Sequence, residues 1–159
     1  MRALAVTVSN RASAGVYEDT SGPVLAALLG ELGCEVTGPV VVPDGEPVLS
    51  ALRAAVADGY DIVVTTGGTG LTPTDQTPEM TRQILDREIP GIAEAIRTFG
   101  AGKVPAAILS RGLAGVSGRT LIVNLPGSKG GVRDGMAVLG PVLAHAVDQI
   151  GGGDHRRTI

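Results

Sequence analysis

One stretch of the chain combines the residue types needed to bind a phosphorylated ligand. It is the sequence TTGGTGLTPTDQTPE, from Thr65 to Glu79, and it directly follows the apolar run Ile62-Val63-Val64. Three glycines leave room where the backbone turns sharply or approaches a ligand, and these are Gly67, Gly68 and Gly70. Asp75 adds a carboxylate, and Thr77-Pro78 predicts an N-cap residue followed by a first-turn proline, so that a helix N-terminus faces the loop. Because such a helix end binds anions and a carboxylate can hold a metal ion, the stretch predicts a phosphate cradle with a metal-binding residue.

Two common phosphate-binding motifs do not explain this stretch. A P-loop ends in Gly-Lys-Ser or Gly-Lys-Thr, and the stretch contains no lysine. A dinucleotide-binding fingerprint needs GxGxxG, whose last glycine is missing from GGTGLT, so a nucleotide-binding oxidoreductase is disfavoured. From the glycines alone, a tight strand-to-helix turn that binds no ligand explains the stretch equally well.

A second glycine-rich loop, NLPGSKGG, runs from Asn124 to Gly131 after another apolar run. Ser128 is placed to cap the following helix and to donate to a phosphate, and Lys129 is placed to neutralise one. For this loop alone, the alternative is that Ser128 only caps the helix and Lys129 is solvated. Arg111, in LSRG between the two loops, is a candidate fork for a phosphate, with a structural salt bridge as the alternative. Two such loops in one chain favour a ligand site over a simple turn.

The composition fits one domain with an aliphatic core. The chain has 159 residues, 43% of them hydrophobic, with 24 glycines and only two tyrosines and one phenylalanine as aromatic residues. This composition is typical of a parallel sheet covered by helices. It predicts a single domain over residues 1–150, followed by a flexible tail over residues 151–159. The formal net charge of −3 argues against nucleic acid as a main partner.

Other residues narrow the kinds of site and the location. Cys34 is the single cysteine, which excludes an internal disulfide and a thiolate zinc site and suits a reducing cytoplasm. His145 and His155 share no metal-binding spacing. No apolar run approaches 18 residues, and the N-terminus does not resemble a signal peptide. We therefore expect a cytoplasmic protein without a membrane partner.

The hydrophobic patterns alternate between strand and helix along the chain. Strands are expected at Ala3–Val8, Val36–Val42, Asp61–Val64 and Thr120–Asn124. The second strand contains Gly38-Pro39, which predicts an edge position or an irregularity. Helices are expected from Ser21-Gly22-Pro23 to Gly33 and at Pro47–Ala57, Pro78–Asp86, Gly91–Arg97 and Arg133–Ile150. The alternation predicts an α/β fold with a mostly parallel sheet, in which ligands bind at the carboxyl ends of the strands.

Polar loops follow all four expected strands, so we expect them to line one crevice. They are Ser9-Asn10-Arg11, Pro43-Asp44-Gly45-Glu46, the TTGGTG loop and the segment from Leu125 to Gly131.

A series of short motifs runs through most of the chain in a fixed order. The motifs are VSN with GVYEDTSGP, VPDGE, TTGGTGLTPTDQTPE, REIPG, LSRG with LAG, and LIVNLPGSKGGVRDG, and they cover about Ala3 to Ile150. This series resembles the molybdenum-cofactor biosynthesis family that includes molybdopterin adenylyltransferases, the Mog and MoaB type proteins. The resemblance implies a three-layer α/β/α domain, commonly assembled as a homotrimer. It also implies transfer of AMP from Mg-ATP to the terminal phosphate of molybdopterin, with release of pyrophosphate.

The resemblance assigns roles to particular residues. The family's paired functional aspartates, taken as catalytic residues and Mg²⁺ ligands, fall on Asp44 and Asp75. Contacts with ATP and molybdopterin fall on Thr66, Gly67, Gly68, Thr69, Gly70, Ser110, Pro126, Gly127 and Ser128. Because joining two phosphates depends on positioning and charge neutralisation, no nucleophilic side chain is required.

Two positions depart from the family pattern. Many members have Ser-Asp where this chain has Ser9-Asn10, and many have Arg where it has Thr74. A carboxylate and a guanidinium are therefore missing from these two places. The alternative function is a MoaB-type protein that binds molybdopterin or serves as a scaffold without strong catalytic activity. Retention of both Asp44 and Asp75 favours an enzyme.

Overall fold

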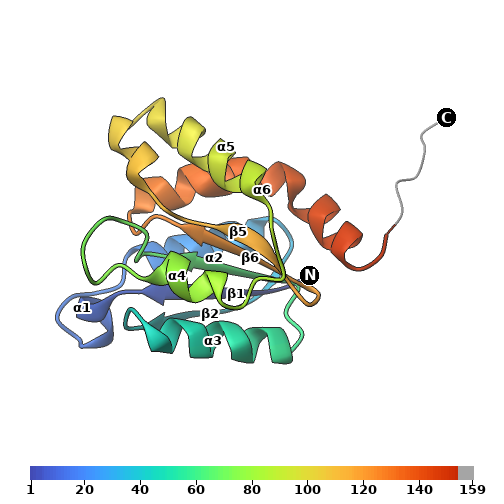
Figure 1. Cartoon of the computed structure of the whole chain (residues 1–159), viewed down its shortest axis with the longest axis horizontal. Coiled ribbons are helices and arrows are strands. Elements are labelled where there is room, and N and C mark those ends of the chain that lie inside the picture. Colours follow the sequence, from blue (N-terminus) through green and yellow to red (C-terminus); the bar gives the residue numbers. More distant parts are fainter. Residues whose placement is uncertain (154–159) are drawn as a thin grey trace.

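A six-stranded mixed sheet forms the middle of the protein (Figure 1). The computed structural model describes residues 1–153, and the strand order is β2-β1-β3-β6-β5-β4. Strands β2, β1, β3 and β6 are parallel, whereas β5 and β4 are antiparallel additions at one side. The strands are β1 (Arg2–Val8), β2 (Glu35–Val42), β3 (Ile62–Thr66), β4 (Arg87–Glu88), β5 (Ala114–Ser117) and β6 (Thr120–Leu125). The prediction of a mostly parallel α/β sheet is confirmed.

Helices cover both faces of the sheet, which gives three layers (Figure 1). The helices are α1 (Asn10–Ser13), α2 (Ser21–Glu31), α3 (Glu46–Ala57), α4 (Thr77–Arg82), α5 (Pro90–Ala101), the 3₁₀ helix η1 (Pro105–Leu109) and α6 (Lys129–Ile150). On one face α2, α5 and α6 bury an aliphatic cluster that includes Leu25 and Leu139. On the other face α3 and α4 bury a second cluster that includes Leu52 and Ile122. Within residues 1–153, no helix is both long and apolar enough to span a bilayer.

The central strands end at the same level of the sheet. Every residue of β3 and β6 is buried, as expected for parallel strands covered on both faces. Thr66 in β3 pairs with Thr7 in β1 and with Leu125 in β6. The loops that follow these three strands therefore start side by side.

β2 lies at the edge of the sheet, as the Gly38-Pro39 dipeptide predicts. Its register with β1 shifts between Leu4 and Val6, opposite that dipeptide. Val42 nevertheless pairs with Val8 at the end of β1. The loop after β2 therefore begins at the same rim as the other three.

Several boundaries differ from the predictions. The short β4 and β5, with two and four residues, and the short α1 and η1 carry too few residues to show a periodic pattern. α4 ends at Arg82 rather than Asp86 because the chain turns there toward β4. α5 is longer than predicted. α6 begins at Lys129 rather than Arg133 because Ser128 caps it.

The single domain over residues 1–150 stays a prediction. Gly151 follows α6 as its C-terminal cap. Residues 151–153 are exposed. The rest of the predicted tail, residues 154–159 with His155, lies outside the described residues.

Candidate active site

The glycine loop after β3 turns where only glycine fits. Gly67 and Gly68 have positive φ angles, +101° and +69°, which L side chains rarely adopt. A Cβ on Gly67 would lie 2.2 Å from Val8 O, and one on Gly68 would lie 2.2 Å from Thr77 Oγ1. The loop therefore packs directly on the end of β1 and the start of α4.

Thr77 fastens the glycine loop instead of capping α4. Its hydroxyl donates to Gly67 O at 3.0 Å, and its N–H donates to Gly68 O at 3.1 Å. The residue in the N-cap position is Gln76, and its side chain makes no capping hydrogen bond. The prediction of Thr77 as the helix cap is therefore wrong by one position.

Hydrogen bonds join this loop to the second glycine-rich loop, after β6. Thr66 Oγ1 donates to Pro126 O at 2.7 Å, and Gly67 N–H donates to Leu125 O at 3.0 Å. A Cβ on Gly127 would lie 3.3 Å from Gly67 Cα. We call the two segments the joined glycine loops, because their backbones form one surface.

Ser128 has the capping role that the sequence predicts. Its Oγ accepts a hydrogen bond from Gly131 N–H at 2.9 Å, at the start of the 22-residue α6. The N-terminus of a long helix carries a partial positive charge that favours anions.

Asp44 is held beside the glycine loop from the end of β2. Its Oδ1 accepts hydrogen bonds from the backbone N–H groups of Gly45 and Gln76, both at 2.9 Å. Its own N–H donates to Asn10 Oδ1 at 2.9 Å, so Asn10 supports this loop. Asp44 Oδ2 makes no hydrogen bond with residues 1–153 and would lie 2.6 Å from a Cβ on Gly68. One carboxylate oxygen is therefore fixed, and the other is available to a ligand.

The surroundings of Asp44 make its negative charge costly. Burial, the largest effect, raises the pKa of the Asp44 carboxyl, whereas the hydrogen bonds from Gln76 and Gly45 lower it. The negative charges of Asp75 and Glu79 raise the pKa further above its ordinary value of 3.8. A bound cation would reverse this effect, so the site favours one.

Asp75 is the second carboxylate of the site, and Arg111 fixes the loop that carries it. Asp75 Oδ2 accepts a hydrogen bond from Thr72 N–H at 3.1 Å. Arg111 donates from Nη2 to Asp75 O at 2.8 Å and from Nε to Gly70 O at 2.9 Å. Its Nη1 forms an ion pair with Glu79. All three guanidinium nitrogens therefore have partners within the protein. These contacts support a structural salt bridge for Arg111, not the binding of a phosphate.

Glu79 is ionised in its ion pair with Arg111, which we call the brace of the Asp75 loop. Burial raises the pKa of Glu79, but the hydrogen bond from Arg111, a backbone hydrogen bond, and the positive charges of Arg111 and Arg82 together lower it more. The pKa therefore lies below its ordinary value of 4.5. The Arg111–Glu79 brace is therefore a charged pair at neutral pH.

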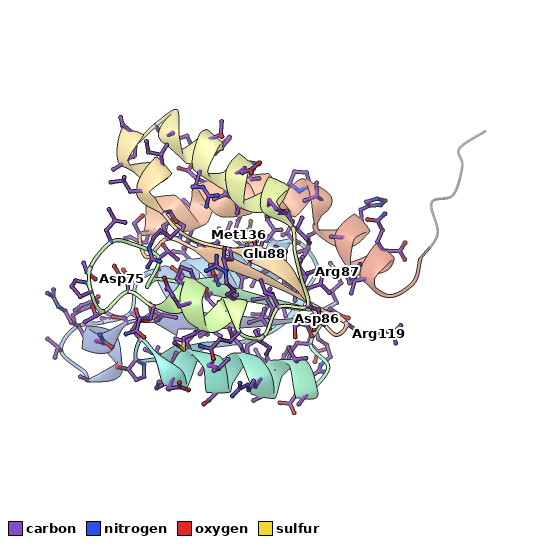
Figure 2. All side chains as sticks on the ribbon, viewed as in Figure 1. Asp75, Asp86, Arg87, Glu88, Arg119 and Met136 are labelled. Carbon is purple, nitrogen blue, oxygen red and sulfur yellow. The ribbon has the colours of Figure 1, made fainter. Side chains whose placement is uncertain are left out.

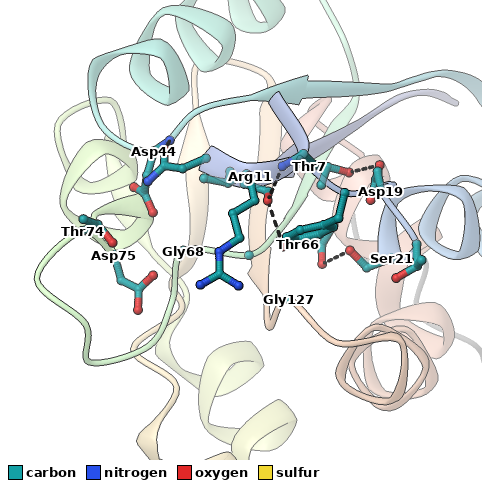
Figure 3. Close-up of a pocket in the computed structure, with 17 residues that line it drawn as sticks. Thr7, Arg11, Asp19, Ser21, Asp44, Thr66, Gly68, Thr74, Asp75 and Gly127 are labelled. Carbon is teal, nitrogen blue, oxygen red and sulfur yellow. Dashed lines mark hydrogen bonds between the residues drawn. The ribbon is translucent and has the colours of Figure 1, made fainter. Parts of the chain in front are cut away.

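Two cavities adjoin at the joined glycine loops. The first has a volume of about 340 Å³ and is lined from the loops after β1, β2, β3 and β6 (Figure 3). This confirms the prediction that those four loops meet. The second has a volume of about 780 Å³ and is lined by the joined glycine loops, α5, η1 and the start of α6. Gly68, Asp75 and Gly127 line both cavities, and we call these three residues the shared wall.

Every site residue predicted from the sequence lines at least one cavity. The first cavity takes Asp44, Thr66 and Gly67, in addition to the shared wall. The second takes Thr69, Gly70, Ser110, Pro126 and Ser128. The structure thus brings these residues together, and their individual roles stay predictions. Lys129 lines neither cavity.

Sequence reasoning missed several charged residues of the cavities. Asp19 lines the first cavity and carried a signal, because it lies in GVYEDTSGP. Arg11 also lines this cavity, as expected for the Ser9-Asn10-Arg11 loop, although no role was predicted for its side chain. Arg97, Lys103 and Arg133 line the second. These three lie on α5, just after α5 and on α6, where the helical pattern shows packing but no chemistry.

The donor set fits a magnesium ion better than a transition metal. Residues 1–153 contain no cluster of three or more His, Cys, Asp or Glu side chains that could hold a metal. Asp44 and Asp75 both line the first cavity. Mg²⁺ keeps several waters and is bound through one or two carboxylates together with substrate phosphates. The available Oδ2 of Asp44 and its raised pKa fit that mode of binding.

Comparisons with known proteins agree with this architecture. Residues 4–145 match the family described as "Probable molybdopterin binding domain". The Mog protein from Mycobacterium ulcerans is 53% identical with a TM-score of 0.90, over 94% of this chain and 98% of that one. MoaB from Thermus thermophilus is 46% identical with a TM-score of 0.89, over 95% of this chain and 96% of that one. The molybdopterin adenylyltransferase of Helicobacter pylori (strain J99) is 37% identical over 152 residues, which are 91% of this chain and 85% of that protein.

Some curated relatives are longer than this protein. The chain spans 25% and 48% of the length of two of them. The family match nevertheless takes in most of the chain, and the similarity to the Mog and MoaB structures is close to full length on both sides. The chain belongs to the molybdenum cofactor biosynthesis family of the Mog and MoaB type.

Proposed function

We propose that this protein is a molybdopterin adenylyltransferase. It transfers AMP from Mg-ATP to the terminal phosphate of molybdopterin and releases pyrophosphate. The observation that carries the proposal is the pair of adjoining cavities with one shared wall. A reaction between two phosphorylated substrates needs two binding sites whose reactive ends meet, because correct positioning supplies much of the rate enhancement. The similarity to the Helicobacter pylori adenylyltransferase supports the same reaction.

The proposed chemistry makes one bond and breaks one. An oxygen of the molybdopterin phosphate attacks the α-phosphorus of ATP, the bond from that phosphorus to the oxygen bridging to the β-phosphate breaks, and pyrophosphate leaves. Both reactants are anions, so the protein must hold them close and neutralise their charge. Backbone N–H groups of the joined glycine loops and the N-terminus of α6, capped by Ser128, are suited to this task.

Asp44 and Asp75 would hold Mg²⁺, which neutralises phosphate charge when it is bound. Two backbone hydrogen bonds fix Asp44 Oδ1, so Oδ2 is held in one direction. The Arg111–Glu79 pair braces the loop of Asp75. The two carboxylates are thus positioned before a substrate arrives, which is how enzymes avoid reorganisation during the reaction.

The alternative is a MoaB-type protein that binds molybdopterin or serves as a scaffold without strong transfer activity. The similarity to MoaB from Thermus thermophilus supports this alternative. The carboxylates of Asp44 and Asp75 in the first cavity support the transferase, because binding an anionic pterin alone does not require them.

The deciding experiment incubates the protein with molybdopterin and Mg-ATP and measures adenylylated molybdopterin by mass spectrometry. The transferase predicts a new pterin product and release of pyrophosphate, both dependent on added Mg²⁺. Tight binding of molybdopterin without any adenylylated product would establish the binding protein instead.

We also propose that the protein is a cytoplasmic homotrimer with neither nucleic acid nor membrane as a partner. Ile108, in η1, is 64% exposed and lines neither cavity, and an adjacent subunit would cover such an apolar side chain. Light scattering at micromolar concentration measures the mass directly. A monomer would refute the trimer.

A further inference from the structure

Each cavity contains one arginine that the protein itself does not use. Arg11 is the only basic residue that lines the first cavity, and its guanidinium makes no hydrogen bond or ion pair within residues 1–153. Arg133 lines the second cavity, and its guanidinium likewise makes no hydrogen bond or ion pair within residues 1–153. A guanidinium carries five N–H donors, so each arginine offers a full set to a ligand.

The other two basic residues of the second cavity are already engaged. Arg97 Nη1 donates to the backbone oxygens of Gly112 at 3.0 Å and Ser110 at 3.4 Å. Lys103 Nζ forms an ion pair with Asp134 at 2.8 Å. Arg133 is therefore the uncommitted cation of this cavity.

The Arg11 side chain crosses the first cavity from α1. Figure 3 shows its guanidinium in the space between Asp75 and Gly127, two members of the shared wall. Asp19 and Asp44 also line this cavity, yet Arg11 forms an ion pair with none of the three aspartates. A cation that lies among carboxylates and pairs with none of them is suited to an anion from outside the protein.

Arg133 lines the second cavity, which Gly68, Asp75 and Gly127 share with the first. It lies one turn into α6, close to the helix end that Ser128 caps. That helix end and Arg133 line the same cavity, so the backbone dipole and a full charge act on the same ligand.

We propose that Arg11 and Arg133 are the side-chain phosphate ligands of the two substrates, one in each cavity. The inference rests on the proposed function, because it assigns one arginine to ATP and the other to molybdopterin. The planar guanidinium fork matches two phosphate oxygens at once, and a lysine ammonium does not reproduce this geometry. The two phosphates then approach the shared wall from opposite sides, each drawn by its own arginine.

The experiment measures the dissociation constants for ATP and for molybdopterin separately, by calorimetry, in Arg11→Gln and Arg133→Gln. Each variant should weaken the binding of one substrate by at least about tenfold, the change that corresponds to about 1.4 kcal/mol. The two variants should affect different substrates. Arg53→Gln is the matched control, because Arg53 is exposed on α3, lines neither cavity and has no side-chain partner within residues 1–153.

Two further measurements separate phosphate binding from a structural role. Adenosine, which has no phosphate, should bind equally well to the wild-type protein and to both variants. Arg11→Lys and Arg133→Lys should recover part of the lost affinity, and the recovered part should shrink as salt is added. A loss that lysine does not recover and that also lowers the melting temperature would overturn the proposal.

The expectation that the two variants weaken different substrates also lets the experiment test this inference separately from the proposed function. A wild-type protein that makes adenylylated molybdopterin supports the function. If that protein also has an arginine variant with both dissociation constants unchanged, or two variants that weaken the same substrate, only the assignment of the arginines is overturned. A wild-type protein that binds neither substrate overturns both.

Discussion

Asp75→Asn separates a chemical role of this carboxylate from a structural one. The substitution keeps the size of the side chain and an oxygen that can accept the 3.1 Å hydrogen bond from Thr72 N–H. It removes the negative charge from the shared wall. Asp75 also lies directly before Gln76, the N-cap residue of α4, where an acidic side chain stabilises the helix.

The magnitudes of the two effects differ widely. Loss of the helix-end charge costs about 0.3–1 kcal/mol, which in a domain of this size lowers the melting temperature by no more than about 4 °C. Removal of one positioned electrostatic group from an active site costs about 10²–10³ in kcat. If Asp75 holds Mg²⁺ or the reacting phosphate, adenylyl transfer should fall by about that factor while the melting temperature hardly moves.

Asp86→Asn is the matched control for this experiment. Asp86 Oδ2 also accepts one backbone hydrogen bond, from Gly118 N–H at 2.7 Å. The residue is exposed and lines neither cavity, and Figure 2 shows it at the opposite end of the protein from Asp75. Its substitution should leave the transfer rate unchanged. Near-normal turnover in Asp75→Asn together with a lowered melting temperature would leave only the helix-end role for Asp75.

Asp44→Asn extends the same reasoning. If Asp44 and Asp75 hold one ion together, each single substitution should remove most of the activity. The double variant should then be little worse than either single variant, because residues that act as a unit are not additive. A double variant whose loss equals the product of the two single losses would mean that the carboxylates act independently.

Three other substitutions or conditions test the remaining parts of the site. Gly68→Ala would place a Cβ 2.2 Å from Thr77 Oγ1 and 2.6 Å from Asp44 Oδ2, so in thermal unfolding it should cost about 1–3 kcal/mol more than Gly59→Ala. Gly59 has a similar φ of +77° with nothing within 4 Å of the added Cβ, and an equal cost for the two variants would contradict the crowding. Thr74→Arg adds a guanidinium to the wall of the first cavity and should tighten ATP or molybdopterin binding at low salt, whereas unchanged affinity in calorimetry would argue against a phosphate near that wall. Mg²⁺ binds the ionised carboxylate, and the pKa of Asp44 is raised. As the pH is lowered, the apparent affinity for Mg²⁺ should therefore begin to fall at a higher pH than it would with an aspartate of ordinary pKa. Asp44→Asn should lose that pH dependence, and a pH profile identical to wild type would exclude Asp44 as its source.

The long elements were predictable because each repeats a hydrophobic pattern several times. β3 and β6 are short apolar runs buried on both faces, and α2, α3 and α6 place aliphatic residues at helical spacing. The antiparallel β4 and β5 were not predictable, since two and four residues leave no period to detect. β5 pairs with the neighbouring β6 in a tight hairpin, with Ser117 opposite Thr120, whereas β4 pairs with β5 through Arg87 and Val116, which lie far apart in the chain.

The candidate site shows the same division between local and long-range information. The glycines of the first loop were predictable from local backbone demands, which the positive φ angles of Gly67 and Gly68 bear out. The role of Arg111 was not, because its partner Glu79 is 32 residues away in sequence. Nothing in the local pattern distinguishes an arginine that braces a loop from one that binds a phosphate. The uncommitted state of Arg11 is likewise visible only once its surroundings are known.

Strand register and backbone hydrogen bonds fix the positions of most of the loops that line this site. The register of β1, β3 and β6 sets the level at which the loops start, and the hydrogen bonds from Thr66 and Gly67 lock two of those loops into one surface. Arg111, paired with Glu79, holds the loop of Asp75 through the Asp75 backbone oxygen. Because these contacts lie within the protein, the position of the shared wall is set before any ligand binds. In the proposed reaction, phosphates that enter from the two cavities would meet a preformed surface, which suits catalysis by positioning.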